Sequence, residues 1–292
     1  GWGEWSLVAA TLEAVRAAFE RCGPLSNLRT YGLSLASITG LDSITGYEDG
    51  PPIAMENAFS DPYAGIFGAF AILTALNHRR NTGEGQHVDF SQQEAIMQMV
   101  GPAYMDYVFN GRSGGPKGNE HPLGKAAPHG VFPCKGDDRW ISIAVATEEE
   151  WQSLLKAFGH PEWLKVAKFK TLEQRLAHID TLHALIGEWT AQFDDRELAI
   201  LLQSHGVAAA PVLNVADLLD DPHYKARQTF VEVTHPLGFK ETIYGAYVKT
   251  SGFEAAVRPG PVIGQDNEHV FKDILGLSET QYQELVERKI IY

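Results

Sequence analysis

The clearest candidate for chemistry in this chain is a carboxylate, Asp61, in the stretch ENAFSDPYAG at residues 56–65. Asp followed by Pro is typical of a helix N-terminus, where Asp caps free N–H groups and Pro62 fits the first turn. The same position suits a nucleophile, because helix N–H groups and the helix dipole stabilise the ionised carboxylate that attacks an acyl carbonyl. The decapeptide alone therefore fits both a capping role and a nucleophilic role.

A second candidate is the loop of residues 110–130, which is rich in Gly and Pro. If this loop is a mobile flap, its backbone N–H groups could meet an oxyanion, and the candidates are Gly114, Gly115, Gly118 and Gly124. The alternative is a linker between two modules. The chain has no P-loop, no GxGxxG after a strand, no HExxH, no GxSxG and no CxxC, and its His residues lack ligand spacing. We therefore predict no metal site.

The composition narrows the class of protein. The 292 residues allow two domains, and the net charge of −13 argues against a nucleic-acid surface, although an anionic ligand can still bind a local basic pocket. Only Cys22 and Cys134 occur, so neither a disulfide framework nor a metal cluster is expected, and a cytoplasmic location fits. No apolar run is long enough to cross a bilayer. The chain starts at GWGEW without Met, which we interpret as a start within a longer protein or after processing.

The elements that would position Asp61 are mainly helical. Apolar spacing predicts helices over 5–21, 62–80 and 92–109, and the alternating HVDFS at 87–91 predicts a short strand. Residues 62–80 are apolar nearly all round, which predicts a buried helix with small residues that permit close packing.

The second half of the chain mixes strands and helices. The patterns predict strands over 139–146, 207–214, 230–236 and 238–252, and helices over 148–159, with Thr147 as cap, 171–187, 194–204, 215–227, 266–276 and 278–289, the last capped by Ser278.

Several ordered blocks resemble the class III CoA-transferases, the family of formyl-CoA transferase, carnitine CoA-transferase and benzylsuccinate CoA-transferase. The blocks are GP with YG and LDSITGYEDGPP at 23–52, Asp61 with Gly65 and the small-residue helix, RRNTGEGQHVDFSQQEA at 79–95, GNEHPLGKAAPHGVFPCKGDDRW at 118–140, and PGPVIGQDNEHVFKDILGLSETQYQELVERKII at 259–291. Together they cover roughly residues 23–292.

The resemblance implies an α/β fold: part of a large α/β domain and a smaller α+β domain, in chains that interlock as a dimer. It implies residues 1–22 as an unmatched helix, 23–125 as the large-domain part with the catalytic Asp, 126–225 as the small domain, and 226–292 as a return to the large domain. The family's N-terminal portion, which carries most CoA contacts, is missing. A partner could supply it, so a homodimer or a heteromer with a related subunit is expected.

The resemblance also implies a reaction. Asp61 would take CoA from an acyl-CoA donor, possibly succinyl-CoA, through an aspartyl anhydride and an aspartyl-CoA thioester, and pass it to a carboxylic acid. CoA and acyl-CoA are then substrates, no cofactor is tightly bound, and Gln92 is a CoA-binding candidate. Neither nucleic acid nor a membrane is an expected partner.

Two other functions fit the same blocks. The related α-methylacyl-CoA racemases pair the matching Asp with an earlier His, but this chain has Tyr31 there, which favours the transferase. A non-catalytic or truncated subunit that acts only in assembly is the other alternative.

Overall fold

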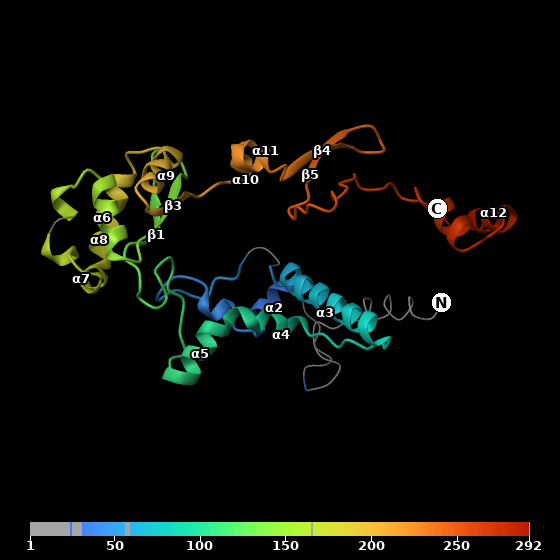
Figure 1. The fold of residues 1–292 in the computed structure, drawn as a ribbon, viewed down its shortest axis with the longest axis horizontal. Coiled ribbons are helices and arrows are strands. Elements are labelled where there is room, and N and C mark those ends of the chain that lie inside the picture. The colour runs from blue at the N-terminus through green and yellow to red at the C-terminus, as the bar shows by residue number, and fades with distance from the viewer. Residues whose placement is uncertain (1–23, 25–30, 56–58, 165, 292) are drawn as a thin grey trace. The chain divides into compact units, whose positions relative to one another are not determined.

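The structure is a computed structural model that describes Pro24 and residues 31–55, 59–164 and 166–291 (Figure 1). The helix predicted over 5–21 lies outside the described residues. The chain divides into two compact units, and the division falls between Pro211 and Val212. Each unit is described by itself.

The first part of unit 1 is helical. Its elements are α2 (Gly32–Ile38), the 3-10 turn η1 (Asp42–Ile44), α3 (Ser60–Thr82), α4 (Gln92–Met97), the 3-10 turn η2 (Gln98–Val100) and α5 (Gly101–Asn110). The helix predicted over 92–109 is broken near Pro102, which has no N–H to donate. A small apolar cluster joins α2, the segment after it and α4, and its members are Leu35, Ala36, Leu41 and Ile96.

Helix α3 has nearly the predicted bounds, but the prediction that it is buried is wrong for the described chain. Only Ser60 and Ala64 of its residues are buried. Ile66, Phe70 and Leu73 are 64%, 70% and 64% exposed, and their spacing places them along one face of the helix. The reason is that α3 contacts mainly α2 and α4 among the described elements, so this apolar face has no cover there. We call Ile66, Phe70 and Leu73 the α3 stripe.

The strand predicted at 87–91 is also wrong: this segment has no regular structure in the part of the chain that is described. Residues 87–91 keep the alternation of a strand, with Val88 and Phe90 less exposed than His87 and Asp89. A strand needs hydrogen bonds to a neighbour, and no described strand pairs with this one.

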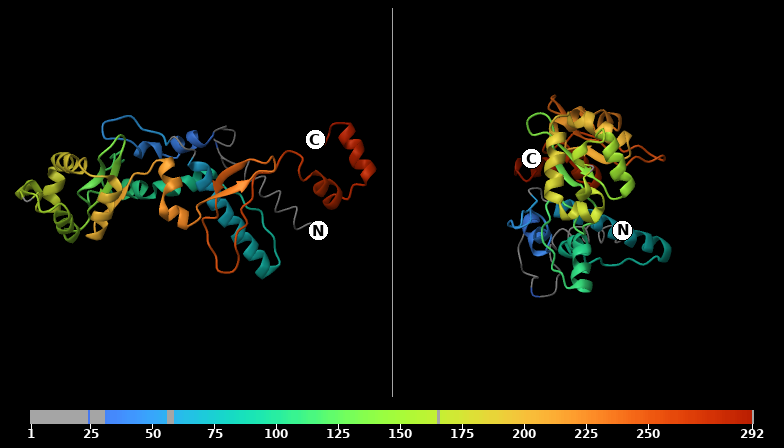
Figure 2. Two further views of the ribbon diagram at one scale, coloured as in Figure 1. Left: turned by 90° about the horizontal axis from the view of Figure 1, so that it is seen from above. Right: turned by 90° about the vertical axis from the view of Figure 1, so that its left-hand side faces the viewer.

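The rest of unit 1 is a module with its own sheet and core, which we call the packed module. Strands β1 (His129–Pro133), β2 (Trp140–Ala144) and β3 (Ala208–Pro211) form an antiparallel sheet in the order β1-β2-β3, with Val131 opposite Ser142 and Ser142 opposite Ala210. The helices are α6 (Glu148–Ala157), α7 (Leu172–Ala177), α8 (Ile179–Thr190) and α9 (Asp195–Ser204), with 3-10 turns η3 (Glu162–Leu164) and η4 (Ala167–Phe169). Two further views show the sheet and these helices together (Figure 2).

The core of the packed module lies where these helices cover one face of the sheet. Phe132, Ile141 and Ile143 point into it from the strands, and Trp151 and Leu182 are fully or almost fully buried on the helices. Helix α6 begins as predicted at Thr147, whose hydroxyl accepts the Glu150 N–H in a reciprocal capping box.

A buried guanidinium ties the segments of this core together. Arg175, 1% exposed, donates to the carbonyls of Ala127 and Phe169 and pairs with Glu148 at 2.9 Å. Its guanidinium also lies 4.6 Å from the Trp151 ring centre. Because the guanidinium has one carboxylate and two carbonyl oxygens as partners, its positive charge is compensated where it is buried.

Unit 2 contains α10 (Val215–Asp220), α11 (Pro222–Ala226), the antiparallel hairpin of β4 (Phe230–Thr234) and β5 (Lys240–Tyr244), the π-helical turn η5 (His269–Ile274) and α12 (Glu279–Glu287). Ser278 caps α12 as predicted. Among the described residues of this unit, the only buried apolar side chains are Tyr282 and Ile291. Unit 2 therefore buries little apolar surface of its own.

Candidate functional site

Asp61 lies in the first turn of α3 and is exposed to solvent. The helix begins at Ser60, two residues before the start expected if Asp61 were the cap, and the capping residue is Phe59, so the predicted capping role of Asp61 is wrong. The first turn still places the Asp61 carboxylate near the positive end of the helix dipole. The carboxylate is thus accessible to a substrate at the start of the helix.

Two buried serines hold the helix starts that lie next to Asp61 and Gln92. The Ser60 hydroxyl donates to the carbonyl of Gly32, the first residue of α2, at 2.7 Å. Ser91 caps α4 by accepting the Glu94 N–H at 3.3 Å. Because Ser60 is next to Asp61 and Ser91 is next to Gln92, these bonds fix the backbone on both sides of the candidate site.

Among the described side chains, Gln92 forms a hydrogen bond with the Asp61 carboxylate. Its amide Nε2 donates to Asp61 Oδ1 at 3.4 Å, which is longer than a typical N–H···O hydrogen bond. Catalytic hydrogen bonds are often long in ligand-free proteins and shorten in the reacting complex. The structure therefore brings together two predicted site residues that are far apart in the sequence.

The predicted flap glycines lie elsewhere in unit 1. Gly114, Gly115 and Gly118 line a cavity of about 1230 Å³ beside α5, whose lining does not include Asp61. The Gly118 N–H donates to the Gly46 carbonyl at 2.8 Å and the Gly124 N–H to the His121 carbonyl at 2.9 Å, so both donors are occupied here. Gly114, Gly118 and Gly124 have positive φ, which suits glycine. An oxyanion role for this loop stays a prediction.

The rim of this cavity carries paired charges. Arg112 pairs with Asp106, and hydrogen bonds from Arg112 and Asn110 hold the pKa of the Asp106 carboxyl below its usual value. Lys117 pairs with Glu48, which raises the pKa of the lysine. These ion pairs leave the apolar side of α5 as the main surface that the cavity offers.

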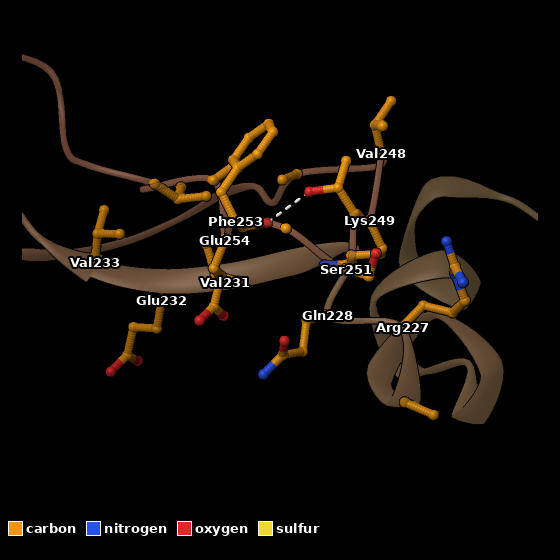
Figure 3. A pocket seen from close by; sticks show the side chains of 16 residues that line it. Arg227, Gln228, Val231, Glu232, Val233, Val248, Lys249, Ser251, Phe253 and Glu254 are labelled. Carbon is orange, nitrogen blue, oxygen red and sulfur yellow. Dashed lines mark hydrogen bonds between the residues drawn. The ribbon is translucent and has the colours of Figure 1, made fainter.

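Two further cavities have linings that do not include Asp61. Gly118 is the predicted site residue in the lining of the first, and the lining of the second includes none. One, of about 750 Å³, lies over the outer face of the β1–β3 sheet, where His129 Nδ1 is 2.7 Å from the Asn119 carbonyl oxygen. The other, of about 790 Å³, lies in unit 2 between the β4–β5 hairpin and residues 246–257 (Figure 3). Its close view shows the bond from Thr250 to the Phe253 carbonyl, with Arg227, Glu232 and Glu254 among the lining side chains.

Among the described residues, no group of three or more His, Cys, Asp or Glu side chains is placed to hold a metal ion. No described helix is both long and apolar enough to span a bilayer. Cys134 is buried, and burial raises the pKa of its thiol to about 11, so it is a weak nucleophile at neutral pH.

The two serines at the site were not predicted from the sequence. Ser91 carried a local signal, because the run SQQE at 91–94 has the spacing of a capping box. Ser60 carried none, because its partner Gly32 is 28 residues away.

Comparison with known proteins places these features in a family. The chain is 28% identical over 293 residues to the succinyl-CoA–D-citramalate CoA-transferase of Chloroflexus aurantiacus, covering all of this chain and 72% of that protein. It is 28% identical over 281 residues to the formyl-CoA:oxalate CoA-transferase of Shigella sonnei, covering 90% of this chain and 67% of that protein.

A solved structure has a similar fold. A CAIB/BAIF family protein from Brucella suis superposes with a TM-score of 0.77 at 26% identity, over 88% of this chain and 66% of the other. The chain thus spans about two thirds to three quarters of the length of these relatives, and the α/β fold expected from the sequence is confirmed. A sequence model of CoA-transferase family III matches residues 13–267. The chain belongs to CoA-transferase family III.

Proposed function

We propose that this chain carries the nucleophile of an enzyme that transfers CoA from an acyl-CoA to a carboxylic acid, with Asp61 as the nucleophile. The observation that supports this most directly is the exposed Asp61 carboxylate in the first turn of α3, hydrogen-bonded by Gln92 from the start of α4. The relatives named above are CoA-transferases, and one takes its name from succinyl-CoA. We therefore propose succinyl-CoA as the donor to test first.

The proposed reaction needs no redox partner. A lone pair of Asp61 Oδ2 bonds to the thioester carbon, the carbon–sulfur bond breaks, and CoA leaves as a thiolate from a mixed anhydride. The thiolate then attacks Asp61 Cγ and releases the donor as a carboxylate, which leaves an aspartyl-CoA thioester. The acceptor carboxylate reverses these two steps with a new acyl group.

The racemase alternative needs a second group that moves a proton. The position where those relatives carry His holds Tyr31, the exposed residue that caps α2. A neutral phenol holds its proton too tightly near pH 7 for that role. CoA transfer is accordingly the better-supported function.

We also propose that the chain works as a homodimer or as a heteromer with a related subunit in the cytoplasm. Large apolar side chains support an assembly: the α3 stripe in unit 1, and in unit 2 Tyr244, Tyr247, Phe253 and Ile263, all exposed. Burial of such side chains is a main driving force for association. The division into segments 1–22, 23–125, 126–225 and 226–292 belongs to this proposal.

A mass measurement tests the function. The chain is mixed with succinyl-CoA and digested, and the peptide that contains Asp61 is weighed. We expect the mass of CoA on that peptide in the wild type and not in Asp61→Ala. A chain that binds CoA but stays unmodified with every acyl-CoA tried would instead support a role in assembly only.

A further inference from the structure

The contact between Gln92 and Asp61 is specific to one carboxylate oxygen. Gln92 Nε2 donates to Oδ1, and no hydrogen bond between described side chains involves Oδ2. Gln92 is the first residue of α4, whose start is held by the buried Ser91 cap. The amide therefore reaches Asp61 from a fixed backbone position, on the oxygen that is not needed for attack.

We infer that Gln92 is a second catalytic residue, which stabilises the negative charge that forms on Asp61 itself during the transfer of CoA. This inference rests on the proposed function. It assigns Gln92 to one class of step, in which the aspartyl carbonyl is attacked, and not to steps in which the acyl carbonyl of the substrate is attacked.

The electron flow explains the assignment. When Oδ2 has joined the donor acyl group in the anhydride, Oδ1 is the carbonyl oxygen of the aspartyl half. Attack of the CoA sulfur on Cγ moves the carbonyl electron pair onto Oδ1, which becomes an oxyanion. When this intermediate collapses, the Cγ–Oδ2 bond breaks, and Oδ2 leaves with the donor carboxylate.

The Gln92 N–H already points at the atom that receives this charge. A donor placed in advance on a developing oxyanion contributes more to the transition state than to the ground state. The oxyanion of the first step forms instead on the substrate's oxygen, which Gln92 does not address in this arrangement. Loss of the amide should therefore slow the return of CoA to Asp61 more than its release from the donor.

The test compares Gln92→Met with Gln93→Met in the complete chain. Met has a similar length and no N–H donor, and Gln93 is a matched control because it lies about 100° further round the same helix. Each protein is mixed with succinyl-CoA without an acceptor acid. Two products are measured over time: CoA attached to Asp61, and free CoA released by hydrolysis of the anhydride.

We expect Gln92→Met to form the aspartyl-CoA thioester about 100-fold more slowly, while free CoA release falls little, so that the ratio of hydrolysis to transfer rises. Gln93→Met should keep the wild-type ratio. Equal slowing of both products in Gln92→Met would assign Gln92 a merely structural role and overturn the inference. A wild type that forms no adduct on Asp61 would overturn the proposed function as well, which distinguishes the two failures.

Discussion

The packed module and the helices that carry Asp61 differ sharply in how much apolar surface each buries. In the module, residues such as Leu182 and Ile186 are fully enclosed between the sheet and its helices. Around Asp61 the buried cluster formed by described residues is Leu35, Ala36, Leu41 and Ile96, and the α3 stripe is exposed in this part of the chain. The region that we propose for chemistry therefore depends on other surfaces for its stability, whereas the module is stabilised mainly by its own core.

The largest expected effect on stability comes from replacing one leucine by alanine in each of the two regions. Leu182→Ala opens a cavity in the module and should cost about 2–5 kcal/mol of unfolding free energy. In a monomeric chain, Leu73→Ala removes an exposed side chain of α3 and should change this free energy by less than about 0.5 kcal/mol. Hydrogen exchange followed peptide by peptide measures both. Similar losses for the two variants would show that α3 is covered in solution, for example by a second copy of the chain.

A smaller effect is expected from removing one cap in each region. Thr147→Ala at the start of α6 should destabilise the module by about 1 kcal/mol. Ser91→Ala should cost a similar amount locally at α4, and because Gln92 follows directly, it should also slow the formation of the Asp61 adduct. Denaturation and adduct kinetics separate the two outcomes. An adduct rate unchanged in Ser91→Ala would argue that the α4 cap does not position Gln92.

The smallest expected effect is a pH dependence confined to the module. His183 packs against Phe132, its buried Nε2 has no hydrogen-bond partner among the described residues, and burial lowers the pKa of the imidazole from its ordinary value of 6.5. The unfolded chain therefore binds a proton that the folded chain resists. Stability should be full above pH 6.5 and fall as the pH drops from there through the lowered pKa of the folded state. His183→Phe should flatten this fall, as measured by denaturant titration at several pH values; an equal slope in the variant would assign the effect to other groups.

Local features in several parts of the chain followed from the sequence, whereas contacts between residues far apart in the sequence did not. The capping boxes at Thr147 and Ser278 and the bounds of α3 were predictable, because caps and helix periodicity are encoded within a few residues. The exposure of α3 was not, since burial depends on which neighbours are present. The same holds for residues 87–91, beside which no described strand lies in a sheet.

The site itself divides in the same way. The place of Asp61 in the first turn of a helix was predictable from the Asp-Pro pair at the helix start, and its role as nucleophile stays a prediction. The hydrogen bonds from Gln92 to Asp61 and from Ser60 to Gly32 join residues that are 31 and 28 positions apart in the sequence. No local sequence pattern encodes such pairs. The glycines at 114–124 were singled out for their flexibility, but flexibility does not tell which cavity a loop lines.

The bond from the Gly118 N–H to the Gly46 carbonyl has a consequence for how such a chain can diversify. It holds together the two ends of the stretch that contains Asp61 and Gln92, so the chain enters and leaves this stretch at neighbouring positions. Insertions between these ends can lengthen the excursion without shifting the residues that follow Gly118, because exposed loops accept added residues most readily. Related chains can therefore differ in the residues around Asp61 while the packed module stays the same.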